Sequence, residues 1–174
     1  FLGFANERSL IHEILFAEYV NEHLKKYGLL FPGGIRQTDN GAEYCGSWSS
    51  KKPSAYTLSL EAYNQKHYTI PPGAHRYQSD VETVHNLMEM EFYEIENFSD
   101  RTDFFEKAYT YQLFFNLLRP NTYKENKSPF ELAKEKIPSL PKEALMLAPV
   151  DLDALLDKKL ANLNERGYDV PSGP

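Results

Sequence analysis

The strongest constraint on the fold is a pair of short strand-like segments set among longer helical patterns. Residues 29–39 turn through Pro-Gly-Gly into a short strand that ends at Asp39, and residues 67–70 (HYTI) form a second strand, closed by Pro-Pro-Gly. Alternating strands and helices predict an α/β fold. The visible strands are too few for a stable sheet, and the chain opens on the strand-like run FLGFA without a Met. We therefore expect a fragment that lacks strands upstream.

Capping residues and helical spacing predict the helices. We expect one core over residues 1–136, and a linker with a C-terminal amphipathic helix over 137–174. The expected helices are residues 5–28 (N-cap Ser9, stop Gly28), 55–66, 79–98 (buried stripe Val81, Val84, Met88, Phe92 and Ile95), 99–118 (N-cap Ser99), 128–136 (capping box Ser128 and Glu131, Pro129 at its first position) and 151–167.

Composition narrows the class of protein. Hydrophobic residues make up 41% and charged residues 25% of the chain, as in ordinary globular proteins. No apolar run is long enough to cross a bilayer, so we expect no membrane partner. Cys45 is the only cysteine, which excludes an intramolecular disulfide and fits a reducing, cytoplasmic compartment. The net charge of −6, concentrated in acids between Asp80 and Glu106, argues against tight DNA binding by this chain alone.

Two carboxylates stand at the rims of predicted elements. Asp39 ends a strand, Glu82 lies in the first turn of the helix over 79–98, and 42 residues separate them. Mg²⁺ takes oxygen ligands and usually binds through one or two carboxylates plus substrate phosphate. Each residue also has a structural interpretation. Asp39 can open a turn at Asn40-Gly41, and Ser79-x-x-Glu82 is itself a capping-box pattern.

A set of motifs in fixed order resembles the catalytic core of the DDE integrases and transposases. TDNGAEY (38–44) is similar to the family segment that holds the second metal-binding carboxylate, and its Asp is Asp39. His67 matches a histidine before a Pro-containing turn, and QSDVETVHN (78–86) matches the helix start whose third carboxylate is Glu82. NLLRP (116–120) followed by Ser128-Pro129 matches the last segment.

The resemblance implies an RNase H-like fold that lacks its N-terminal strands and carries a helical C-terminal extension. It implies DNA end cleavage and strand transfer with two Mg²⁺ or Mn²⁺ ions, with DNA and further copies of the protein as partners. In a bacterium the protein would be associated with the nucleoid. The family's first Asp has no counterpart upstream of Asp39, so we expect this chain alone to be inactive. The family's helix start usually carries a Gly after its Gln and a basic residue after its Glu, and this chain has Ser79-Asp80 and Thr83 there instead. The spacing between Asp39 and Glu82 is longer than is usual in the family, and residues 46–55 resemble an insertion.

Further residues are candidates for supporting roles. Asn40 would turn the backbone away from the metals, and Glu43 and Asn86 would support the site; both of the latter can equally be solvated surface residues. His67 would orient the site, or else is a histidine satisfied at a strand edge. Lys51 and Lys52, in a Ser- and Gly-rich loop, would contact DNA by charge, or are simply solvated.

Three other functions fit parts of the sequence. The first is a non-catalytic DNA-scaffold or oligomerisation module of the same fold. The second is an RNase H-like nuclease that cuts without joining ends. The third is a helical interaction protein, in which Asp39 and Glu82 serve only as turn and cap.

Overall fold

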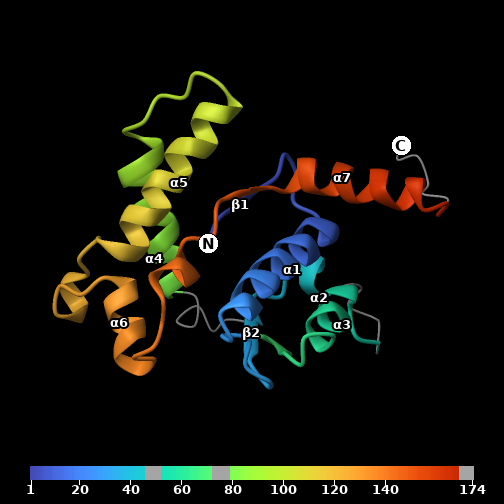
Figure 1. Cartoon of the computed structure of the whole chain (residues 1–174), viewed down its shortest axis with the longest axis horizontal. Coiled ribbons are helices and arrows are strands. Elements are labelled where there is room, and N and C mark those ends of the chain that lie inside the picture. The colour runs from blue at the N-terminus through green and yellow to red at the C-terminus, as the bar shows by residue number, and fades with distance from the viewer. Residues whose placement is uncertain (46–51, 72–78, 169–174) are drawn as a thin grey trace.

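A computed structural model of the chain describes residues 1–45, 52–71 and 79–168 (Figure 1). It is a mixed α/β structure in which helices predominate. The elements are β1 (Gly3–Phe4), α1 (Leu10–Lys26), β2 (Ile35–Thr38), α2 (Ala42–Cys45), α3 (Ala55–Glu61), β3 (Lys66–Thr69), α4 (Ser79–Met88), α5 (Arg101–Leu117), α6 (Pro129–Lys136), β4 (Val150–Asp151) and α7 (Leu152–Glu165). Within these ranges, no helix combines the length and apolar character needed to span a bilayer.

The described strands form two small parallel sheets. β1 pairs with β4, and β2 pairs with β3 in a register that sets Thr38 beside Thr69. Because β2 and β3 are parallel, α2 and α3 lie in the crossover between them, and Asn40-Gly41 does not form a hairpin. One face of the β2–β3 pair packs on helices, whereas Ile35 and Tyr68 on the other face are 65% and 52% exposed.

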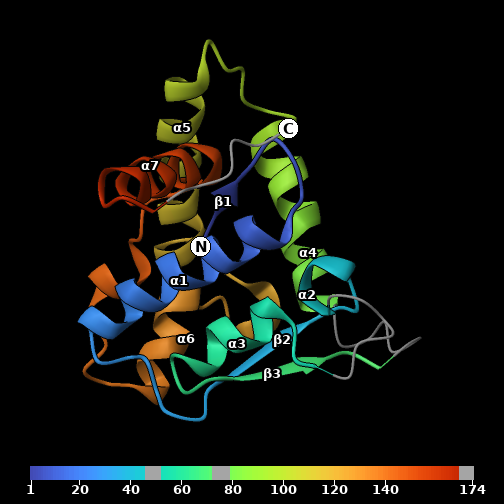
Figure 2. The same ribbon diagram turned by 90° about the vertical axis from the view of Figure 1, so that its right-hand side faces the viewer.

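Helix α1 is the centre of one lobe of the molecule, which comprises α1, α3, β4 and α7. Ser9 caps it by accepting from the His12 amide, and the chain leaves it at Gly28 with a φ of +67°, as its sequence predicts. One side of α1 packs Leu15 against β4 and α7, and another packs Ala17 against α3. Figure 2 shows α1 passing between α7 and the layer of α3 with β2 and β3.

Helix α4 departs from the expected single long helix over 79–98. Its α-helical hydrogen bonding ends at Met88 and a π-helical turn follows (Glu89–Tyr93). Of the expected buried stripe, Met88 and Phe92 are 8% and 1% exposed, but Val81, Val84 and Ile95 are exposed. The prediction was wrong for these three because no element among the described residues buries the first turns of α4 or the residues after the π-helical turn.

Helix α5 carries the second lobe. Its N-cap is Asp100, which accepts from the Asp103 amide, and not Ser99 as predicted; Ser99 instead donates to the Asp103 carboxylate. Both are capping residues one position apart, and the local pattern does not distinguish them. The aromatic side chains of α5 pack with Met88 and Phe92 in a third core cluster.

The C-terminal third runs back along this scaffold. The capping box of α6 is confirmed, with Ser128 and Glu131 each accepting from the other's amide. Residues 137–149, expected as a linker, contain a 3-10 turn (Lys142–Leu145) and bury Leu140, Ala144 and Leu147. Their carbonyls accept hydrogen bonds from Tyr109, Gln112 and Asn116 of α5. Helix α7, capped by Asp151, then packs on α1.

Candidate functional site

A pocket of about 570 Å³ lies where β2 and β3 end. In Figure 2 the two strands run side by side toward the end of the molecule where α2 and α4 lie. In open α/β sheets, the carboxyl ends of parallel strands are the usual place for a ligand site. Besides Asp39 and Glu82, its lining comprises Arg8, Glu13, Gln37, Thr38, Tyr44, Ile70, Val81 and His85. The fold thus brings to one cavity the two carboxylates that the sequence singled out.

Each carboxylate oxygen of Asp39 has a different contact. Its Oδ1 accepts from the Gly41 amide at 2.9 Å, which is an Asx turn, and its Oδ2 lies 3.8 Å from Nη2 of Arg8. The side chain remains 44% exposed. The structural role expected of Asp39 is therefore present, and its second carboxylate oxygen lies beside Arg8 in the lining of the pocket.

Two polar side chains hold the strand ends together behind Asp39. Asn40 donates its Nδ2–H to the carbonyl of Ile70 at 2.6 Å, which fastens the end of β2 to the end of β3. His67 lies between the hydroxyls of Thr38 and Thr57, with its Nε2 at 2.8 Å and its Nδ1 at 2.9 Å. Because Thr38 donates to the Asp39 carbonyl, it accepts from Nε2–H of His67; Thr57, at Nδ1, also contacts Oγ of Ser54 at 3.0 Å.

Burial lowers the pKa of His67. Both ring nitrogens of His67 have a hydrogen-bond partner, so it is a satisfied histidine at a strand edge, and through Thr38 it links β3 to the end of β2.

The other predicted site residues are dispersed. Glu82 is exposed in the first turn of α4 and lines the pocket. Ser79, the other residue of the capping-box pattern, is the first residue of α4. Asn86 is exposed one turn beyond Glu82 and does not line the pocket. Glu43 lies in α2, with its side chain outside the described atoms, and Lys51 lies outside the described residues. Lys52 is exposed and does not line the pocket.

Sequence reasoning missed or set aside several residues that line this pocket. Glu13 faces it although it belongs to a helix and not to a strand, and it hydrogen-bonds Tyr44. Burial and Glu13 together raise the pKa of Tyr44. Arg8 and His85 add basic groups to the same cavity. No motif marks these residues; the only signal is that Arg8 and Glu13 lie at the start of α1, which folds toward the strand ends.

The donors in the pocket suit a hard cation in type. Asp39 and Glu82 offer carboxylate oxygens, and one or two carboxylates with substrate phosphate is the usual Mg²⁺ arrangement. Within the described part of the chain, no three His, Cys, Asp or Glu side chains are grouped closely enough to hold a metal by themselves. The residues thus fit a two-carboxylate site that shares its ion with a ligand, and not a closed metal cage.

The remaining motif residues have structural contacts. Arg119 of the NLLRP segment makes a bidentate ion pair with Glu91 in the π-helical turn, and Asn116 donates to the Leu145 carbonyl. These contacts join α5 to its neighbours on both sides. They place the segment in the scaffold, away from the pocket.

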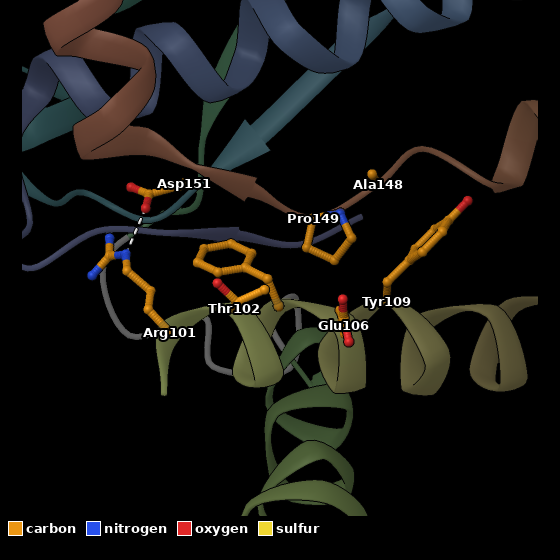
Figure 3. A pocket seen from close by; sticks show the side chains of 8 residues that line it. Arg101, Thr102, Glu106, Tyr109, Ala148, Pro149 and Asp151 are labelled. Atoms are coloured by element: carbon orange, nitrogen blue, oxygen red, sulfur yellow. Dashed lines mark hydrogen bonds and ion pairs between the residues drawn. The ribbon is translucent and has the colours of Figure 1, made fainter. Parts of the chain in front are cut away.

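A second pocket, of about 430 Å³, lies between α5 and the chain leading into β4 (Figure 3). Arg101 closes one end by pairing with Asp151, Nε to Oδ2 at 2.5 Å. Phe105, Pro149 and Tyr109 line it toward the other end. Its charged groups are Arg101 and Asp151, which pair with each other, and Glu106. The strand-end pocket contains both carboxylates that the sequence singled out and is the stronger candidate site.

Comparisons of the chain with protein-family models, with curated proteins and with solved structures found no match.

Proposed function

We propose that this chain is the catalytic core of a DDE-type polynucleotidyl transferase with an RNase H-like fold, which cleaves DNA ends and transfers strands. The single observation that carries the proposal is the shared pocket of Asp39 and Glu82 at the ends of the parallel strands β2 and β3. Two side chains with 42 residues between them line this one pocket, one from a strand end and one from the helix after the next strand.

In this proposal Asp39 and Glu82 hold Mg²⁺ or Mn²⁺ together with a phosphate of DNA. When bound there, the metal would supply polarisation of the attacking oxygen and stabilisation of the leaving oxygen of an in-line displacement. The chain's own residues orient the donors. The Gly41 amide fixes one oxygen of Asp39, while Asn40 and His67 keep the strand ends from separating. Such positioning is the main contribution of proteins to phosphoryl transfer.

A specific observation also favours a second candidate, a non-catalytic DNA-scaffold or oligomerisation module of the same fold. Arg8 lies 3.8 Å from Oδ2 of Asp39, and no group of three metal-ligating side chains exists among the described residues. A carboxylate paired with arginine can be purely structural. Metal binding separates the two candidates.

The test is a titration of the chain with Mn²⁺, followed by electron paramagnetic resonance of the free ion, for the wild type and for Asp39→Asn and Glu82→Gln. We expect saturable binding that either substitution weakens by about tenfold or more, because each removes one of two charged donors. Asp80→Asn is the matched control, since Asp80 shares the first turn of α4 but does not line the pocket. Binding unaffected by Asp39→Asn and Glu82→Gln would refute the proposed site and favour the scaffold function.

Activity is tested separately on labelled duplex oligonucleotides with Mn²⁺. Three carboxylates are expected from the resemblance, and Asp39 and Glu82 account for two, so we expect no nicking or joining by the chain alone. Efficient nicking abolished by Glu82→Gln would contradict that expectation and show that another residue, for which Glu13 is the first candidate, completes the site. Nicking without any joined product would favour a nuclease over a transferase.

A further inference from the structure

An apolar groove of about 680 Å³ lies between β1 and α4 and is called here the β1–α4 groove. Residues 1–4, Phe16 of α1 and successive turns of α4 line it. Figure 2 shows β1 running between α1 and α4. It adjoins the strand-end pocket, because Val81 and His85 line both cavities, but it includes neither Asp39 nor Glu82.

The wall that α4 contributes is an apolar stripe that the described residues leave partly exposed. Val81 is 55% exposed and Val84 is 39% exposed, and both face the groove. Met88, next in the same stripe, is buried. An apolar stripe at helical spacing is normally buried, and its burial stabilises the fold. Val81 and Val84 do not contribute this stabilisation in full because they remain exposed. An exposed apolar patch with a polar rim is typical of an interaction surface.

The floor of the groove is a strand with an open edge. Within the described residues β1 has a strand partner on one side only, where it pairs with β4. An unpaired strand edge offers backbone N–H and C=O groups to an added strand. A peptide in extended conformation can bond such an edge while its alternate side chains enter an adjoining apolar cavity.

The charged residues that line the groove indicate which kind of partner it can bind. Its acidic lining residues are Asp80 and Glu89, both on the α4 side; the other ionisable groups of its lining residues are the side chains of His85 and Tyr93 and the α-amino group of Phe1. None of its lining residues is Lys or Arg. Complementarity therefore favours an occupant with apolar side chains and basic residues.

We propose that the β1–α4 groove binds an extended apolar peptide segment bearing Lys or Arg, added as a strand along the free edge of β1. The apolar side chains of the segment cover Val81 and Val84, and its basic residues pair with Asp80 and Glu89. This goes beyond the proposed catalytic function and does not depend on it.

The test uses a fluorescein-labelled decapeptide of alternating valine and lysine, titrated with the whole chain and followed by fluorescence anisotropy. We expect saturable binding to the wild type. Val84→Lys should weaken it by about tenfold or more, because it removes apolar contact and adds a like charge. Ile95→Lys is the matched control, an exposed apolar residue of the same region outside the groove, and should change binding by less than about twofold. Circular dichroism of each variant establishes that it is folded.

Each other outcome overturns the inference. Equal binding of a valine–glutamate decapeptide would show that charge does not select the occupant. Equal weakening by Val84→Lys and Ile95→Lys would place the peptide elsewhere, and no binding of either peptide would exclude this occupant. Self-association abolished by Val84→Lys and unaffected by excess peptide would identify a second copy of the chain as the occupant. Mn²⁺ binding at Asp39 and Glu82 is measured independently, so failure of one proposal leaves the other intact.

Discussion

At the scale of single residues, Asn21 is a polar side chain in a position that a hydrophobic residue would normally occupy. It is fully buried on α1. Its Nδ2–H donates to Gln65 at 3.1 Å and its Oδ1 accepts from Arg36 at 2.8 Å. The side-chain amide supplies the donor and the acceptor that these two partners require. Burial lowers the pKa of Arg36, so the hydrogen bond to Asn21 compensates a partly desolvated cation of β2.

We expect Asn21→Ala to lower the free energy of unfolding by about 2–4 kcal/mol, because it leaves both Arg36 and Gln65 without their buried partner. Urea unfolding followed by circular dichroism measures the change. Lys26→Ala, an exposed change at the end of the same helix, is the control and should cost less than about 0.5 kcal/mol. Equal costs for the two variants would show that the network contributes no stability.

Glu91 is one of the residues whose titration links pH to stability. Hydrogen bonds from Arg119 lower its pKa below the ordinary value of 4.5. A carboxyl group whose pKa is depressed by folding contributes stability above its unfolded pKa, and that contribution is lost as pH falls through the folded pKa. The contribution of Glu91 is thus complete above about pH 4.5 and decreases below it.

We expect Glu91→Gln to destabilise the protein at neutral pH by about 1–3 kcal/mol and to make stability less sensitive to acid below about pH 4.5. Thermal unfolding of wild type and variant across the acid range measures both effects. Glu94→Gln, an exposed acid just beyond the same turn, should leave the profile unchanged. A Glu91→Gln profile parallel to that of the wild type would contradict the assignment.

At the scale of elements, the contact between β1 and α1 depends on a residue without a side chain. A Cβ placed on Gly3 would lie 2.7 Å from Cδ2 of Phe16 and 3.3 Å from Leu152 of α7. The strand therefore lies directly on the ring of Phe16. This close approach sets where β1 lies between α1 and α7, and hence where the β1–α4 groove opens.

Gly3→Ala should lower the free energy of unfolding by about 1–3 kcal/mol through overpacking against Phe16. A double-mutant cycle with Phe16→Leu, measured by urea unfolding, tests the mechanism. The cost of Gly3→Ala should shrink when the ring is absent, since the space it needs is then available. An unchanged cost in the Phe16→Leu background would indicate that the strain lies elsewhere.

At the scale of the whole molecule, the hydrophobic core is divided. One cluster joins α1 to β4 and α7, a second joins α1 to α3, and a third joins α4 to α5 around Phe92. Figure 1 shows α5 and α6 on the opposite side of the molecule from α1, α2 and α3. Separate clusters allow one lobe to open while the other remains folded.

We expect Phe92→Ala to remove hydrogen-exchange protection from α5 while α1 and α3 remain protected, since truncating a buried aromatic costs about 3–5 kcal/mol locally. Exchange followed by mass spectrometry of peptides from the two lobes measures this. Leu60→Ala is the matched change in the second cluster and should show the reverse pattern. Parallel loss of protection in both lobes would establish a single cooperative unit.

The sequence by itself determined those features that depend on a few neighbouring residues. Ser9 and Ser128 cap helices as predicted, Gly28 ends α1, and the strands at 35–38 and 66–69 lie within a residue of their expected positions. Caps, turns and strand propensity depend on residues within about one helical turn, so the local sequence predicts them. Ser99 was mistaken for a cap because Asp100 beside it competes for the same role.

Tertiary structure alone decided which surfaces are covered and which side chains meet. Helical spacing identified the apolar face of α4, yet Val81 and Val84 lie in an open groove, because burial depends on elements distant in the chain. Asp39 and Glu82 were singled out in the sequence, but their common pocket, with Arg8 and Glu13 from α1, follows from the parallel pairing of β2 with β3. That pairing joins residues about 30 positions apart, and no local signal encodes it.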